Sequence, residues 1–164
     1  MEQVLTQNDQ TFASRHGLRL AERLGFGIHG IIFAALGNPE TGVTAIKAHR
    51  AWEPYTRELA VYERLKEARL CKILGFNAPQ LLRHEDEQRV FEMSIVTTPF
   101  LLDFAGAYVD KSPEFPDEIR AGWESETRDQ FDLRWPQVQM VVSELKQLGI
   151  HMVDVSPSNI AFLE

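Results

Sequence analysis

The segment Gly25-Phe26-Gly27-Ile28-His29-Gly30-Ile31-Ile32-Phe33 decides how this chain of 164 residues is interpreted. Its glycines follow the spacing G-x-G-x-x-G and carry no Cβ, so backbone N–H groups there can approach phosphate oxygens closely. A dinucleotide-binding turn of this spacing would open a helix. Here the β-branched and aromatic residues that follow predict a strand instead. The alternative is a plain hairpin whose glycines supply positive φ angles.

Strand and helix signals extend on both sides of this loop up to residue 99. Strands are predicted from alternation and β-branched residues, turns from Gly, Pro and Asn, and a helix from a period near 3.6 that begins around Pro54. The expected order is a polar lead-in (1–15), a strand (18–24), a second strand (31–36), a turn (37–42), a third strand (43–48), a helix (55–72), a fourth strand (80–84), a fifth strand (89–96) and a linker (97–99).

The remainder of the chain predicts a mostly helical region. A short helix is expected over 101–108, followed by a long loop over 110–136 with room for one helical piece. Apolar residues at helical spacing predict a helix over 137–148, which Gly149 closes as a C′ residue. Residues 150–162 are expected to be a loop that enters a short strand.

Lys47 lies on the predicted third strand between apolar residues and is either exposed or held in a cleft. Glu58 lies early in the following helix, on the face that Val61 and Leu65 turn inward. A carboxylate on that face can pair with Lys47 and direct its ammonium at phosphates. Glu63 is the rival partner, but it lies five residues further on and points elsewhere around the helix.

The segment Asp154-Val155-Ser156-Pro157-Ser158-Asn159-Ile160 places an acid and an amide five residues apart in a loop stiffened by proline. In a phosphotransferase such an acid orients the acceptor hydroxyl and such an amide binds a metal ion. The alternative is an Asx-type turn without catalytic meaning.

In this order the segments resemble the protein-kinase-like superfamily from about Leu18 to Phe162. The resemblance implies an α+β fold with a five-stranded antiparallel N-lobe sheet, one αC-like helix and a reduced, mostly helical C-lobe. It implies a single domain over 1–164, with the N-lobe at 1–96 and the hinge and minimal C-lobe at 97–164. ATP and Mg²⁺ are the implied ligands. The resemblance implies that Gly25, Gly27 and Gly30 cover the ATP phosphates, that Lys47 holds them and that Glu58 holds Lys47. It implies that Asp154 is the catalytic acidic residue, that Asn159 is a metal ligand and that the segment from Met93 to Thr98 is the hinge against the adenine.

The chain departs from that family at several positions. Met152, Val153 and Ser156 replace the usual residues around Asp154, and no Asp-Phe-Gly follows Asn159. Transfer would therefore need an acid from elsewhere, for which Asp103, Glu164 and a partner chain are the candidates. Two functions stay open: a minimal phosphotransferase that moves the γ-phosphate to a hydroxyl of a protein or small molecule, and a catalytically inactive pseudokinase-type module that binds nucleotide or a protein.

Composition excludes several other classes. The net charge of −7 without a basic run argues against nucleic acid and anionic membranes as partners. Cys71 is the only cysteine, so no internal disulfide forms and a reducing cytoplasm is expected. No apolar run approaches the roughly 20 residues of a membrane span. The apolar stripe of the 137–148 helix suggests homodimerisation.

Overall fold

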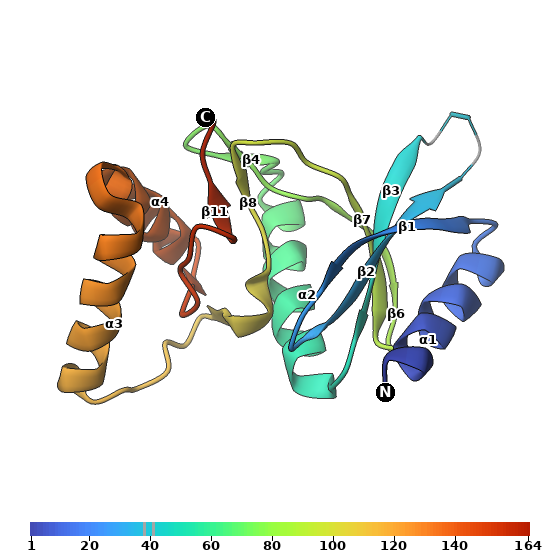
Figure 1. The fold of residues 1–164 in the computed structure, drawn as a ribbon, viewed down its shortest axis with the longest axis horizontal. Helices are drawn as coiled ribbons and strands as arrows, with labels where there is room; N and C mark the ends of the chain where they lie inside the picture. The colour runs from blue at the N-terminus through green and yellow to red at the C-terminus, as the bar shows by residue number, and fades with distance from the viewer. Residues whose placement is uncertain (38, 41) are drawn as a thin grey trace.

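The computed structural model describes residues 1–37, 39–40 and 42–164, so the predicted 37–42 turn lies partly outside the described residues. A large sheet with two flanking helices lies beside a helical region and a smaller sheet (Figure 1). The elements in chain order are α1 (Glu2–Arg15), β1 (Arg19–Phe26), β2 (Gly30–Leu36), β3 (Val43–His49), α2 (Trp52–Glu67), β4 (Lys72–Ile73), β5 (Phe76–Asn77), β6 (Leu81–Glu85), β7 (Val90–Ser94), β8 (Phe100–Leu101), the 3₁₀ helix η1 (Phe104–Gly106), β9 (Tyr108–Val109), α3 (Asp117–Phe131), the 3₁₀ helix η2 (Asp132–Arg134), α4 (Trp135–Gln147), β10 (Ile150–His151) and β11 (Ile160–Ala161).

The large sheet has five strands in the order β1-β2-β3-β7-β6, and every neighbouring pair is antiparallel. The predicted α+β class and five-stranded antiparallel sheet are therefore confirmed. Each predicted strand overlaps an observed one, with boundaries shifted by a few residues. Residues 18–24, for example, correspond to β1 (Arg19–Phe26).

A helix covers each face of this sheet, and the alternation along β3 shows which residues face which helix. Ile46 and Ala48 pack in the cluster that includes Leu5 and Phe12 of α1, while Ala45 packs in the cluster of α2. Lys47 and His49 have the parity of Ala45, so they lie on the α2 face. The central strand therefore turns Lys47 and His49 toward α2.

The prediction of a loose lead-in over residues 1–15 is wrong, because α1 spans nearly all of it. Its buried residues are Leu5, Asp9, Phe12 and Ala13, which lie on one side of a helix. Asp9 lies in the middle of this buried stripe, so the stripe does not look apolar in the sequence. α2 confirms the predicted helix but ends at Glu67, and Arg69 just beyond it has a φ of 56°, which is not helical.

The segment predicted as a short helix over 101–108 is instead a strand, one turn of 3₁₀ helix and a second short strand. β8 pairs with β11 through Leu101 opposite Ile160, and with β5 on its other side. Asp103 follows β8 with a φ of 55°, and its carboxylate accepts the N–H of Ala105 at the start of η1. Pairing with residues distant in the chain therefore overrides the local helical signal.

The segment 110–136 is more helical than predicted, since the one helical piece allowed there is α3, which occupies fifteen of these residues. Only Phe131 of α3 is buried, so the helix has almost no apolar period to detect. α4 confirms the predicted helix, and Gly149 follows it with a φ of 78°, as expected of a C′ residue.

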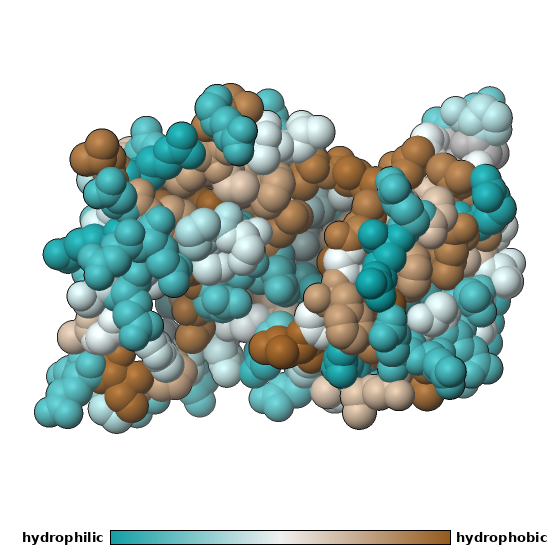
Figure 2. All heavy atoms as spheres, viewed as in Figure 1, coloured by the Kyte–Doolittle hydropathy of each residue, from teal (hydrophilic) through white to brown (hydrophobic). Residues whose placement is uncertain are grey.

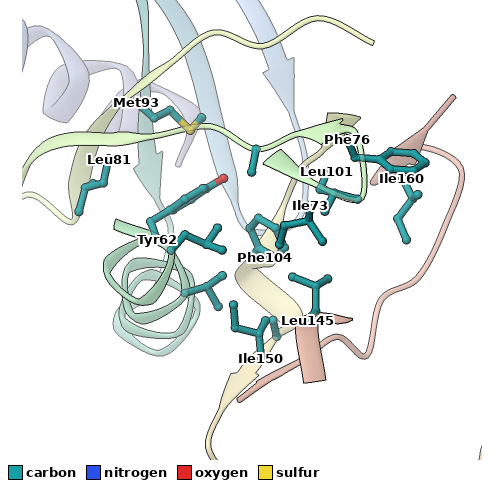
Figure 3. Packing of buried hydrophobic residues seen from close by; sticks show 14 of the residues in the cluster. Tyr62, Ile73, Phe76, Leu81, Met93, Leu101, Phe104, Leu145, Ile150 and Ile160 are labelled. Atoms are coloured by element: carbon teal, nitrogen blue, oxygen red, sulfur yellow. The ribbon is translucent and has the colours of Figure 1, made fainter. Parts of the chain in front are cut away.

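The apolar stripe of α4 is buried within the chain itself. Val138, Val141 and Leu145 belong to the cluster that also holds Phe104 and Ile150, part of which Figure 3 shows. Homodimerisation stays a prediction, but this stripe no longer supports it. Among the described residues no helix combines the length and apolar character needed to cross a membrane.

Candidate functional site

A cavity of about 550 Å³ lies between the β1–β2 hairpin, β3, α2 and two segments of the helical region. Figure 2 shows the surface hollowed between the sheet and the helical region. Most predicted site residues line this cavity, which brings together segments more than 100 positions apart. Its polar and glycine lining consists of Gly25, Gly27, His29, Gly30, Lys47, Glu58, Tyr62, Ser94, Asp103, Ser158 and Asn159.

The glycine hairpin forms one wall of the cavity. The N–H of Gly27 donates to the carbonyl of Gly30 at 3.0 Å, which closes the turn. None of the three glycines has a positive φ, so the plain-hairpin alternative does not explain them. Gly30 is required for packing, because a Cβ there would run into the carbonyl oxygen of Ala48. A Cβ on Gly27 would meet nothing within 4 Å, so neither packing nor conformation requires that glycine.

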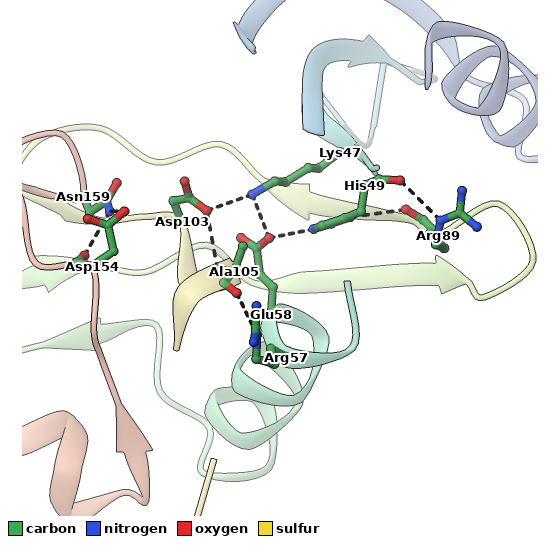
Figure 4. Close-up of polar contacts among 9 residues, drawn as sticks. All are labelled: Lys47, His49, Arg57, Glu58, Arg89, Asp103, Ala105, Asp154 and Asn159. Carbon is green, nitrogen blue, oxygen red and sulfur yellow. Dashed lines mark hydrogen bonds and ion pairs between the residues drawn. The ribbon is translucent and has the colours of Figure 1, made fainter. Parts of the chain in front are cut away.

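Lys47 and Glu58 form an ion pair at the base of the cavity, as predicted. The Nζ of Lys47 lies 2.7 Å from Oε2 of Glu58, and the two side chains are 4% and 1% exposed (Figure 4). Glu63, the rival partner, is about half exposed and lies 3.9 Å from a nitrogen of His84. The exposed-lysine alternative is therefore excluded, and Glu58 is the partner.

His49 is a member of this network that the sequence reasoning missed. Its Nε2 lies 2.7 Å from Oε2 of Glu58, and its Nδ1 lies 3.2 Å from the carbonyl oxygen of Arg89. We assign the ring proton to Nε2, because a carboxylate is the stronger acceptor. The signal was available, since a residue two positions after Lys47 on a strand lies on the same face.

Burial and ion pairing together set the charges in this network. Burial by itself raises the pKa of Glu58, but the Lys47 ammonium and the His49 ring outweigh it and lower that pKa to about 2. Burial lowers the pKa of His49, which keeps the ring neutral at pH 7. Burial also lowers the pKa of Lys47, yet Glu58 and Asp103 raise it above its ordinary value. The site therefore holds a permanent ammonium.

Two buried polar atoms in the cavity lining have no hydrogen-bond partner in the part of the chain that the structure describes. They are Oε1 of Glu58 and the hydroxyl of Tyr62, whose side chain Figure 3 shows near Met93. Both residues are 1% exposed. Buried polar groups normally have a partner, so these two atoms are available to water or to a ligand in the cavity.

Asp154 and Asn159 lie together at the other side of the cavity. The Nδ2 of Asn159 donates to the Asp154 carbonyl oxygen at 3.1 Å and to its Oδ2 at 3.2 Å. Asn159 is buried and lines the cavity, whereas Asp154 is exposed beside it. The predicted pair is thus brought together, with the acid at the solvent side.

The remaining wall of the cavity is apolar. Met93 lies opposite Ala45 in the β3–β7 ladder, and Ile95 and Val96 follow it along the predicted hinge. An apolar slot of this kind suits a flat heteroaromatic ring. The apolar lining is completed by Leu24, Phe26, Ile28, Ile32, Ala45, Pro79 and Leu102.

Among the described residues no three His, Cys, Asp or Glu side chains gather closely enough to hold a metal ion by themselves. A site shared with a phosphate ligand needs fewer such side chains, since Mg²⁺ is commonly held by one or two carboxylates plus phosphate oxygens.

Neither a scan against protein-family models nor a search of curated proteins gives a match to this chain.

Proposed function

We propose that the chain is a kinase-like protein that binds ATP in this cavity and transfers its γ-phosphate to a hydroxyl group. The observation that carries the proposal is Lys47, a buried ammonium whose carboxylate partner comes from α2 and which lines a cavity under a glycine hairpin. A buried cation with room beside it for an anion is an arrangement that phosphate-binding sites use.

The walls of the cavity match the parts of a nucleoside triphosphate. The apolar slot around Met93 suits the base, and the hairpin with Gly25 and Gly27 leaves space for phosphate oxygens to approach backbone N–H groups. The cavity of about 550 Å³ falls within the range of small-molecule sites. Base, phosphates and reacting end would then run from the hinge toward Asn159.

Asp154 is the proposed catalytic base. In the transfer step an acceptor oxygen forms a bond to the γ-phosphorus while the bond from that phosphorus to the β–γ bridging oxygen breaks. ADP leaves with the electron pair of the broken bond, and the hydroxyl proton passes to the Asp154 carboxylate. Asn159 keeps that carboxylate oriented through its Nδ2.

Mg²⁺ is the metal that fits the oxygen ligands of the site, and it would supply charge neutralisation on the phosphates. The side-chain oxygen of Asn159 would be one ligand for it, because Nδ2 is already engaged with Asp154. Lys47 would contribute a second positive charge to the phosphates.

A nucleotide-binding module without transfer is the second candidate. It is favoured by the contact of Lys47 with two acids, Glu58 and Asp103, which neutralises the ammonium before any phosphate arrives. In that case ATP binds weakly and Asp154 has no chemical role.

The two candidates are separated by measuring ADP formation from Mg²⁺–ATP in the presence of a panel of hydroxyl acceptors, both proteins and small molecules. The proposal predicts acceptor-dependent ADP release that falls at least about 100-fold in Asp154→Asn. Asp129→Asn, which changes an exposed acid of α3, is the matched control and should be unaffected. Equal ADP release by the native protein and Asp154→Asn would rule out transfer at this site.

A further inference from the structure

Asp103, one of the candidates for the additional acid, lies in the cavity opposite the segment that carries Asn159. Leu101 lies opposite Ile160 in the β8–β11 pair, and the N–H of Leu102 donates to the carbonyl of Asn159 at 2.8 Å. The next residue, Asp103, therefore leaves β8 beside the Ser158–Asn159 turn, and all three line the cavity. Figure 4 shows its carboxylate between Lys47 and the Asp154–Asn159 pair.

The segment that follows Asp103 also contacts the catalytic acid. Gly106 lies so close to Asp154 that a Cβ on it would come within 3.5 Å of the Asp154 Cβ. Phe104 is fully buried and anchors the turn in the core next to Tyr62, at 5.5 Å between ring centroids. Asp103 is consequently held in place by a strand on one side and a buried aromatic ring on the other.

The Asp103 carboxylate has one oxygen engaged and one available. Oδ1 accepts the Lys47 ammonium at 3.1 Å and the N–H of Ala105 at 3.4 Å. Oδ2 has no partner among the described residues, and the side chain is 39% exposed toward the open cavity. An oxygen of this kind beside a carboxamide is a donor set that a hard divalent cation accepts.

We propose that Asp103 and Asn159 jointly hold a divalent cation, Mg²⁺, so that the second acid of the site comes from the segment before α3 and α4 and not from residues after Asn159. The inference rests on the proposed function, because the remaining ligands would be nucleotide phosphates and water. Oε1 of Glu58, buried and unpartnered in the same cavity, is an acceptor for a metal-bound water.

The metal site would take its second acid from a different position in the chain than the resemblance implies. The acid that completes the metal site precedes the helices and the Asp154 loop, whereas the resemblance places it after them. The β8–β11 pairing brings residues 103 and 159 together in space. An acid placed before the Asp154 loop can therefore reach the same position as one placed after it. The site then needs neither Glu164 nor an acid from a partner chain.

The test is calorimetric titration with ATP in the presence of Mg²⁺ and, separately, with ATP in EDTA. Asp103→Asn removes the charge but suits the backbone, since Asn tolerates a positive φ. We expect this variant to lose about 10-fold or more of the affinity gained from Mg²⁺. Its affinity for metal-free ATP should stay equal or increase, because a negative charge next to the phosphates is removed. Asp129→Asn is the control, because it removes the same charge from an exposed position on α3.

The outcomes separate the inference from the proposed function. If the native protein binds ATP equally well with Mg²⁺ and with EDTA, the metal site is overturned and nucleotide binding stands. If it binds ATP in neither condition, both fail. If Asp103→Asn weakens metal-free ATP as much as Mg²⁺–ATP, the role of Asp103 is structural and the inference is overturned.

A second measurement needs no variant. Mn²⁺ added with ATP broadens the NMR signals of nuclei near the metal, and the inference predicts broadening of the amides at 102–104 and 158–160. Broadening confined to the exposed acids Asp86 and Glu87 would place the metal elsewhere and contradict it.

Discussion

The Nζ of Lys47 lies 2.7 Å from Oε2 of Glu58, and both side chains are almost completely buried. The carboxylate also contacts the Nε2 of His49 at 2.7 Å, so one oxygen serves two donors. A buried ion pair contributes little net stability compared with apolar packing, but removing one partner leaves a buried charge uncompensated. This pair therefore fixes the position of the ammonium, and its disruption should be costly.

Glu58→Gln should lower the free energy of unfolding by about 3 kcal/mol at pH 7, because Lys47 then keeps only its contact with Asp103. Urea denaturation measures this. Glu63→Gln, on the same helix but half exposed, should change stability by less than about 0.5 kcal/mol. Equal effects of the two substitutions would show that the pair is not formed.

The lowered pKa of Glu58 gives this pair a defined pH dependence. With a pKa of about 2 in the folded state and an ordinary value of 4.5 in the unfolded state, its stabilisation is fully present above pH 4.5. It is lost as the pH falls from 4.5 toward 2. Between pH 5 and pH 3 the native protein should lose more stability than Glu58→Gln does, as measured by denaturation at each pH.

Asp9 on α1 should show the opposite dependence. It is fully buried, neither carboxylate oxygen has a partner in the described part of the chain, and burial raises its pKa to about 8. The protonated form is favoured in the folded state, so stability is greatest below pH 4 and is lost as the pH rises through 8. Asp9→Asn should be more stable than the native protein by at least about 2 kcal/mol at pH 8. Thermal unfolding at pH 8 and pH 4 checks this, and a gap that does not shrink at pH 4 would contradict it.

Two glycines of the hairpin should respond differently to alanine. Gly30→Ala should destabilise the protein by about 1–3 kcal/mol, because its Cβ would run into the Ala48 carbonyl. Gly27→Ala has free space around it and should leave stability nearly unchanged while weakening ATP binding. Chemical denaturation and ATP titration of both variants test this. Loss of stability in Gly27→Ala would mean that this glycine is structural.

Local patterns in the sequence account for the sheet, for α2 and α4, and for the pairing of Lys47 with Glu58. Strand alternation and helix period place both side chains, and the period also separates Glu58 from Glu63. His49 was within reach of the same reasoning. α1 was missed because Asp9 interrupts its apolar stripe. The length of α3 was not predicted because that helix buries almost nothing.

The position of Asp103 could not be predicted in this way. It depends on β8 and β11, which are two residues long and carry no period, and on a contact between residues 101 and 160. The residues around Asp103 look locally helical, and only their partner strand makes them extended. Contacts of such long range are determined by tertiary packing and leave little trace in the sequence of either segment.

The most direct test of nucleotide binding is calorimetric titration of Mg²⁺–ATP into the native protein, Lys47→Met and the control Lys146→Met, which changes an exposed lysine at the end of α4. Met fills much of the volume of Lys47 without its charge. The account predicts that the native protein and the control bind alike and that Lys47→Met binds at least about 10-fold more weakly while remaining folded by circular dichroism. Binding that is unchanged in Lys47→Met, or absent from the folded native protein, would contradict it.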